Sequence, residues 1–107
     1  MEIELIGSEE FEEVKKDKNI YLVDVRKNKE YNEEHIKGAV NIPLEDIEDI
    51  ENGNILLLRR LWRVLKSGKR IILYCKTGTR SMRGAKMLGE YGIKSASVFG
   101  ISIFGID

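Results

Sequence analysis

The chain has 107 residues, a mass of 12.3 kDa, and 18 basic residues against 18 acidic ones. This length argues for a single domain over residues 1–107, and a composition of 42% hydrophobic and 34% charged residues excludes collagen-like and disordered chains. The single cysteine excludes an internal disulfide and a cysteine zinc site. We expect a cytoplasmic protein without nucleic-acid or membrane partners, because the charges balance, no signal-peptide pattern is visible, and no apolar run approaches the ~18–20 residues of a membrane span.

The charges are unevenly distributed along the chain. Residues 1–53 hold sixteen acidic and seven basic residues, whereas residues 54–107 hold two acidic and eleven basic ones. In one interpretation the fold brings the two halves together and neutralises them. In the other, the positive half faces an anionic ligand or partner, and the presence of the only cysteine, Cys75, in that half favours it.

In chain order, the first half predicts a weaker strand, a helix, a buried strand and a second weaker strand. Ile3–Ile6 is a weaker strand candidate, and Ser8 follows it as a helix cap with two acidic residues behind it. Ile20–Val23 is apolar throughout and rich in β-branched and aromatic residues, which is typical of a strand buried on both faces of a parallel sheet. Ala39–Ile42 is a weaker strand candidate.

The second half continues the alternation of helices and strands. Two apolar stripes at helical spacing predict helices: Leu58, Leu61, Trp62 and Leu65, and then Met82, Ala85, Leu88 and Tyr91. Gly92 ends the second helix as a C-terminal cap, Ile71–Tyr74 reads as another buried strand, and Ala96–Phe99 as a last, weaker one. The pattern predicts an α/β fold with a mainly parallel sheet, in which ligands bind at the carboxyl ends of strands.

Cys75 stands at such a strand end. A short loop with one glycine, Gly78, follows it, and a helix is predicted to begin near Thr79–Ser81. Backbone N–H groups of a tight loop form an anion-binding concavity, and the start of a helix adds further N–H groups and the positive end of its dipole. Three cations add formal charge: Lys76, Arg80 and Arg83. We therefore predict a lowered pKa for the Cys75 thiol and an anionic substrate held against its sulfur.

Each of these residues also has an ordinary interpretation. A lone cysteine is commonly a small buried hydrophobe, Gly78 fits a plain turn, and Arg80 fits a solvated helix position. The combination of strand end, loop, helix start and cations favours a nucleophile in an anion-binding loop.

Three segments together make the sequence resemble the rhodanese-like domain family. They are Asp24-Val25-Arg26, then Tyr31 with Glu34-His35-Ile36-Lys37-Gly38-Ala39-Val40-Asn41-Ile42-Pro43, and then Cys75-Lys76-Thr77-Gly78-Thr79-Arg80-Ser81. The resemblance runs from about residue 3 to residue 100. It implies a rhodanese-like α/β fold, with a central parallel sheet of about five strands flanked by helices on both faces. It also implies thiosulfate sulfurtransferase activity through a cysteine persulfide, with no cofactor and no metal.

The resemblance assigns a role to each residue of the site. Cys75 would be the nucleophile, and five residues would bind the anionic substrate: Lys76, Thr77, Gly78, Thr79 and Arg80. Asp24, Arg26 and Ser81 would support the loop, and His35 would be structural rather than a general base. The implied partners are a small anionic sulfur donor such as thiosulfate, and a thiol, protein thiol or cyanide as the acceptor.

The sequence departs from the family pattern at three places. Glu34 precedes His35 where glycine is common, and Lys76 stands where arginine is frequent, which keeps the charge but loses the bidentate fork. One glycine, Gly100, replaces the usual pair, so we expect the last helix to be shortened or repacked around Ile103 and Phe104.

Two other functions remain open. Cysteine phosphatases, and related arsenate reductases, also use a thiolate in an anion-binding loop ending in arginine, but their Cys-x5-Arg loop is one residue longer than the Cys-x4-Arg loop of Cys75 and Arg80. The other alternative is a non-catalytic rhodanese-like module that docks a partner or carries a persulfide.

Overall fold

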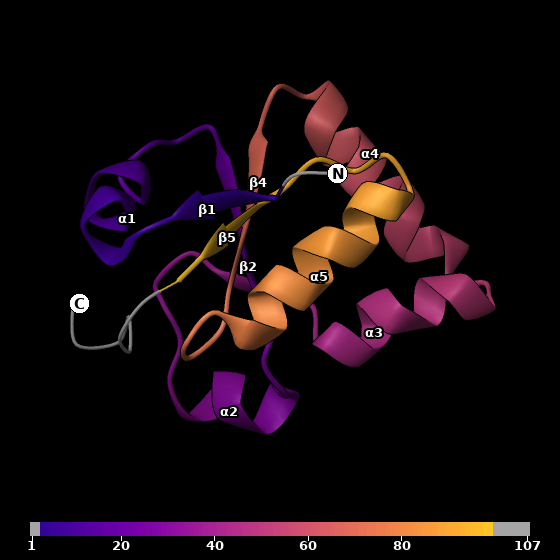
Figure 1. Cartoon of the computed structure of the whole chain (residues 1–107), viewed down its shortest axis with the longest axis horizontal. Helices are drawn as coiled ribbons and strands as arrows, with labels where there is room; N and C mark the ends of the chain where they lie inside the picture. Colours follow the sequence, from indigo (N-terminus) through magenta and orange to yellow (C-terminus); the bar gives the residue numbers. More distant parts are fainter. Residues whose placement is uncertain (1–2, 100–107) are drawn as a thin grey trace.

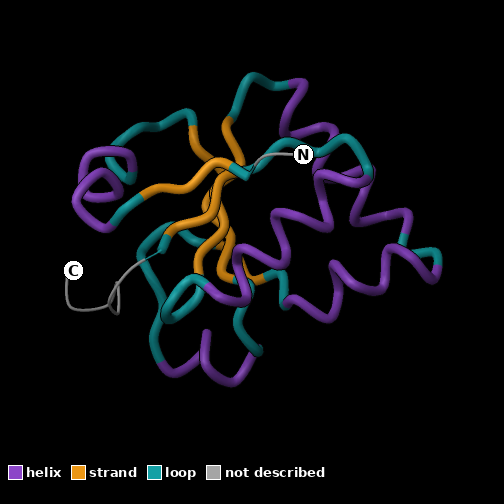
Figure 2. The backbone as a smooth tube through the Cα atoms, viewed as in Figure 1, coloured by secondary structure: helices purple, strands orange, loops and turns teal. Residues whose placement is uncertain are grey.

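The computed structural model describes residues 3–99 and has a central sheet between helices (Figures 1 and 2). The strands are β1 (Glu4–Ile6), β2 (Ile20–Asp24), β3 (Val40–Asn41), β4 (Arg70–Tyr74) and β5 (Ala96–Val98). All pair in parallel, in the order β1-β5-β4-β2-β3. The predicted α/β class and the five-stranded parallel sheet are therefore confirmed, and β3 is the shortest strand.

Helices cover both faces of the sheet. They are α1 (Ser8–Val14), α2 (Asn28–Glu33), α3 (Leu44–Glu48), a 3-10 turn η1 (Asp49–Asn52), α4 (Ile55–Lys66) and α5 (Thr79–Glu90). One face packs against α3, α4 and α5, and the other packs against α1 (Figure 1). Because Ile72 and Tyr74 of β4 face one layer while Ile71 and Leu73 face the other, the four buried positions of this strand after Arg70 are all occupied by large, mainly apolar side chains.

Cys75 continues this alternation of β4. It belongs to the core cluster on the α3–α4–α5 side of the sheet, together with Leu73. The register of the buried strand thus sets the direction in which the cysteine side chain leaves the backbone.

Three details of the expected helices are wrong. Gly7, not Ser8, is the cap of α1, and Ser8 is the first helical residue. Trp62 of α4 and Met82 of α5 are 42% and 41% exposed. Of the stripe predicted for α4, Leu61 is buried and Leu58 and Leu65 pack against the same core while partly buried, so only Trp62 departs from it.

The two oppositely charged halves of the chain are joined by ion pairs. Three cations of the basic half contact acids of the acidic half: Arg70 with Glu4, Arg80 with Glu30, and Arg83 with Glu48. The fold thus neutralises part of the charge asymmetry internally, as the first of the two interpretations expects.

No helix within residues 3–99 is both long enough and apolar enough to cross a bilayer. The expected rearrangement of the last helix around Ile103 and Phe104 lies outside the described residues.

Candidate active site

The loop of residues 75–78 joins β4 to α5 and lies beside α2 (Figure 1). β4 ends at Tyr74 and α5 begins at Thr79, within the range that the sequence predicted for the helix start. Gly78 immediately precedes the helix with a φ of +105°, a conformation that side chains rarely adopt. This left-handed residue turns the chain so that the first amides of α5 face back toward Cys75.

Two amide donors and one hydroxyl group surround the sulfur of Cys75. The Gly78 N–H donates to Sγ at 3.1 Å and the Ser81 N–H donates to it at 3.4 Å. The Ser81 hydroxyl oxygen lies 3.7 Å from the same atom. Cys75 is only 2% exposed, so its sulfur lies almost entirely out of contact with bulk water.

The pKa of the Cys75 thiol lies below its ordinary value. Burial is the largest single influence and acts to raise the pKa, but hydrogen bonds oppose it. These come from the Ser81 amide and hydroxyl, then from the amides of Gly78 and Thr77, and together they outweigh burial. The predicted direction of the shift is confirmed, and its main source is Ser81 in the first turn of α5, followed by the amides of the loop.

A small network of hydroxyls holds Ser81 in place. Its Oγ lies 2.7 Å from Ser97 Oγ, and it can donate to the carbonyl oxygens of Gly78 at 3.1 Å and Val98 at 3.3 Å. Ser97 is a fully buried residue of β5 that the sequence analysis did not single out. A serine inside an otherwise apolar strand was the only available signal for it.

We expect Ser81→Ala to raise the pKa of the Cys75 thiol. The substitution removes the hydroxyl that hydrogen-bonds Sγ, and a bond worth about 1 kcal/mol shifts the thiol–thiolate equilibrium about fivefold toward the thiol. Because Cys75 is the only cysteine, titration of the thiolate ultraviolet absorbance measures this group alone among thiols.

Ser97→Ala is the matched control for this titration. It removes the same kind of hydroxyl from the same network, but Ser97 has no described contact with Sγ. An equal shift in both variants, or no shift in Ser81→Ala, would contradict a direct role of the Ser81 hydroxyl in stabilising the thiolate.

The three cations that the sequence placed around Cys75 differ in how they pair with acidic side chains. Lys76 is exposed and forms no ion pair within residues 3–99. Arg80, by contrast, binds Glu30 of α2 at 2.7 Å and 3.2 Å, and Arg83 binds Glu48 of α3 at 3.0 Å. Among the described residues, Lys76 is thus the one of these three cations without an acidic partner, whereas the two arginines are held by acids.

Asp24 and Arg26 form a buried pair at the end of β2, where Asp24 lies opposite Tyr74 of β4. The Arg26 guanidinium donates to both carboxylate oxygens of Asp24 at distances of 2.8 to 3.1 Å, and it also binds the Glu34 carbonyl. The Asp24 carboxylate in turn accepts a hydrogen bond from the Tyr74 hydroxyl. Burial is the main reason that the pKa of this hydroxyl is raised. Because Tyr74 directly precedes Cys75, the pair is connected to Cys75 through the end of β4.

The same hydroxyl connects the end of β4 to the segment around His35. The Ile36 N–H donates to Tyr74 Oη at 3.0 Å. His35 itself is exposed, stacks on Tyr31 with ring centroids 3.8 Å apart, and places Nδ1 2.9 Å from the Tyr31 carbonyl. These contacts fit the structural role that the resemblance implies for His35.

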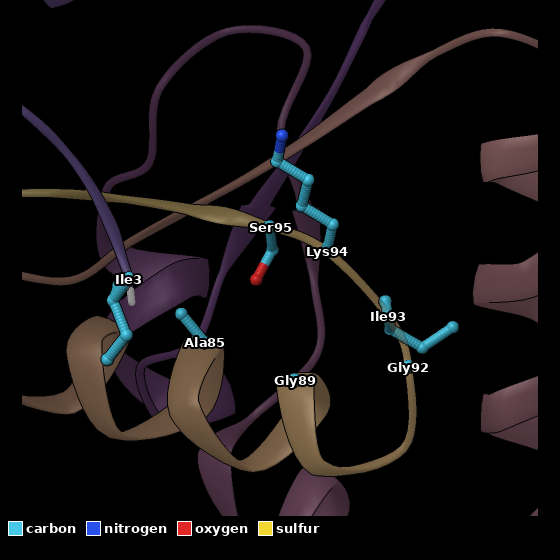
Figure 3. A pocket seen from close by; sticks show the side chains of 7 residues that line it. All are labelled: Ile3, Ala85, Gly89, Gly92, Ile93, Lys94 and Ser95. Atoms are coloured by element: carbon cyan, nitrogen blue, oxygen red, sulfur yellow. The ribbon is translucent and has the colours of Figure 1, made fainter. Parts of the chain in front are cut away.

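A separate pocket of about 270 Å³ lies at the far end of α5 and β5. Figure 3 shows the Ser95 hydroxyl pointing toward α5 in this pocket. Its lining residues are Ile3, Ala85, Gly89, Gly92, Ile93, Lys94 and Ser95. None of them belongs to the loop that holds Cys75, so the pocket is separate from the candidate site.

A family of known proteins matches the segment that contains these site residues. The family model of the rhodanese-like domain matches residues 8–102, which include the whole Cys75 loop. The chain belongs to this family. The resemblance noted in the sequence is thereby confirmed.

Two curated proteins and one solved structure illustrate how close the similarity is. A thiosulfate:glutathione sulfurtransferase of Saccharomyces cerevisiae is 31% identical over 101 residues, covering 88% of this chain and 73% of that protein. The Bacillus subtilis protein YtwF is 33% identical over 101 residues, covering 94% and 87%. A rhodanese-like domain protein from Staphylococcus aureus has the same fold, with a TM-score of 0.67, 24% identity, and coverage of 92% and 86%.

Proposed function

We propose that this rhodanese-like chain transfers a sulfane sulfur from thiosulfate to a thiophilic acceptor through a persulfide on Cys75. The observation that carries the proposal is the pair of amide hydrogen bonds from Gly78 and Ser81 to Sγ. They favour the thiolate, which is the nucleophilic form of cysteine, and the activity named for the yeast relative supports the choice of donor.

In the first half-reaction the Cys75 thiolate attacks the outer sulfur of thiosulfate. The S–S bond of thiosulfate breaks, sulfite leaves with the bonding electron pair, and a Cys75 persulfide remains. The backbone amides at residues 77, 78 and 81 stabilise negative charge on sulfur before and after this step, in the manner of an oxyanion hole. Lys76 and Thr79 complete the proposed binding loop, and Arg80, which is paired with Glu30, lies at its rim.

In the second half-reaction the acceptor attacks the outer sulfur of the persulfide. A thiolate acceptor becomes a persulfide, and the Cys75 thiolate is regenerated with the electron pair of the broken bond. Such a covalent intermediate gives ping-pong kinetics. Glutathione, cyanide and a protein thiol are the acceptors to compare, and the name of the yeast relative favours glutathione.

The position of Arg80 argues against phosphatase activity. A phosphatase loop uses its arginine to bind the phosphoryl group, but both terminal nitrogens of Arg80 contact Glu30. The loop is also one residue shorter than that of cysteine phosphatases.

Intact mass measurement after exposure to thiosulfate tests the function. The expected result is a gain of one sulfur atom, which must lie on the only cysteine and which glutathione or cyanide then removes. Hydrolysis of p-nitrophenyl phosphate without persulfide formation would replace the proposal by the phosphatase alternative. A chain that gains no sulfur and hydrolyses nothing would be a non-catalytic module.

A further inference from the structure

Glu30 holds Arg80 at the rim of the Cys75 loop. Both guanidinium end nitrogens of Arg80 reach the two carboxylate oxygens, at 2.7 Å and 3.2 Å. Both side chains are about one third exposed, and Arg80 is the second residue of α5. The contact therefore joins α2 directly to the beginning of the helix whose amides face Sγ.

The Glu30 carboxylate is fixed from its own helix as well. Its Oε1 also accepts from the Lys27 N–H at 3.2 Å, which caps the start of α2. The hydrogen bond from Arg80 is the main reason that the pKa of Glu30 falls to about 2. At neutral pH this group is therefore a permanent negative charge beside the loop.

That negative charge lies next to the loop of residues 75–78, because its partner Arg80 is the second residue of the helix that follows the loop. Arg80 interacts electrostatically with Cys75, so a group bound to Arg80 also lies within range of a donor at Sγ. With Glu30 in place, the Arg80 charge is compensated, and Lys76 is left as the uncompensated cation of the loop within residues 3–99. A donor with two negative charges meets more repulsion from the carboxylate than a donor with one.

We propose that Glu30 is a specificity-determining residue that acts through Arg80 and lowers the preference of the loop for dianionic over monoanionic sulfur donors. This inference rests on the proposed sulfurtransferase function and adds to it the charge class of the donor. Glu30 need not touch the reacting atoms, because the effect is electrostatic and passes through the paired guanidinium.

Two sulfur donors that react by the same steps but carry different charges can show the effect of donor charge on the rate. Thiosulfate is a dianion, and methanethiosulfonate is a monoanion in which a methyl group replaces one oxygen. In both, the Cys75 thiolate attacks the outer sulfur and the S–S bond breaks. Sulfite leaves in one case and methanesulfinate in the other, each with the electron pair, and the same Cys75 persulfide forms.

The test measures the second-order rate of persulfide formation with each donor in wild type and Glu30→Gln. Glutamine keeps the size of the side chain and a carbonyl acceptor for Arg80, but it removes the charge. We expect the thiosulfate rate to rise about fourfold to tenfold and the methanethiosulfonate rate about twofold to threefold, because the electrostatic energy scales with donor charge. The change in the ratio should shrink as salt is added.

Glu48→Gln is the matched control. It makes the same charge change in the Glu48–Arg83 pair, which lies one turn further along α5. We expect it to change the ratio of the two rates much less than Glu30→Gln does. Glu30→Asp, which retains the charge, should stay close to the wild-type ratio.

The outcomes separate the inference from the function on which it rests. Rates that fall by the same factor for both donors in Glu30→Gln would show a purely structural role and overturn the inference, while the sulfurtransferase function would stand. An equal change of the ratio in Glu48→Gln would also overturn it. If wild type gains no sulfur from either donor, the proposed function is refuted and the role of Glu30 falls with it.

Discussion

Replacing Cys75 by serine is expected to abolish persulfide formation while leaving the fold intact. An alcohol is hardly ionised at neutral pH and has no sulfur with which to carry the transferred atom, so the rate of sulfur transfer should fall by a factor of about 10³ or more. Intact mass after thiosulfate exposure and steady-state release of sulfite measure the loss. Turnover retained in Cys75→Ser would refute the assignment of the nucleophile.

The stability of the variants tests the hydrogen bonds to Sγ separately. Serine still offers an acceptor to the amides of Gly78 and Ser81, whereas alanine leaves both without one in a buried site. A buried polar group that loses its partner costs about 1–3 kcal/mol, so Cys75→Ala should unfold at lower urea concentration than Cys75→Ser. Equal midpoints would mean that the amides do not depend on the side-chain acceptor.

Much of the fold follows from local patterns in the sequence. Ile20–Val23 and Ile71–Tyr74 are apolar at every position because the sheet is covered on both faces, and they correspond to the central strands β2 and β4. The short loop after Cys75 and the start of α5 at Thr79 were predictable because a single glycine separates a strand from a helical stripe.

The way in which the helices pack on the sheet was harder to predict from the sequence. Periodicity identifies an apolar stripe, but it does not show which edge of the stripe meets the sheet. In α4 the burial is centred on Leu57 and Leu61, and the Trp62 ring instead lies against the turn at Gly92. A large side chain can thus occupy a stripe and still remain 42% exposed.

The missed residues of the site come from distant segments. Glu30 is fifty positions from Arg80 and Ser97 is sixteen from Ser81, so no local spacing joins them. Acidic residues are common in the first half of the chain, and nothing distinguishes Glu30 among them until the parallel sheet brings α2 beside the loop. Position at a strand end before a short loop singled out Cys75 as the candidate nucleophile, whereas tertiary contacts determine the electrostatic surroundings of that residue.

Gly78→Ala is expected to have the second large effect on sulfur transfer. A Cβ at this position would lie 3.0 Å from the Phe99 Cα and 3.1 Å from the Val98 carbonyl oxygen, both backbone atoms, and φ is +105°. The loop must therefore shift, and the Gly78 N–H moves away from Sγ. Because the loss of one such donor typically costs 10²–10³ in rate, we expect the rate of persulfide formation to fall about a hundredfold or more.

Gly53→Ala separates this local effect from ordinary backbone strain. Gly53 has the same φ of +105°, but a Cβ there meets nothing within 4 Å, and the residue lies in the turn before α4. Both variants should lose about 1–2 kcal/mol of stability from the left-handed backbone, with an additional loss in Gly78→Ala from the close contacts. Only Gly78→Ala should slow persulfide formation, because only this glycine donates to the sulfur. If the two variants transferred sulfur equally well, the approach of the Gly78 amide to Sγ would have no part in the reaction.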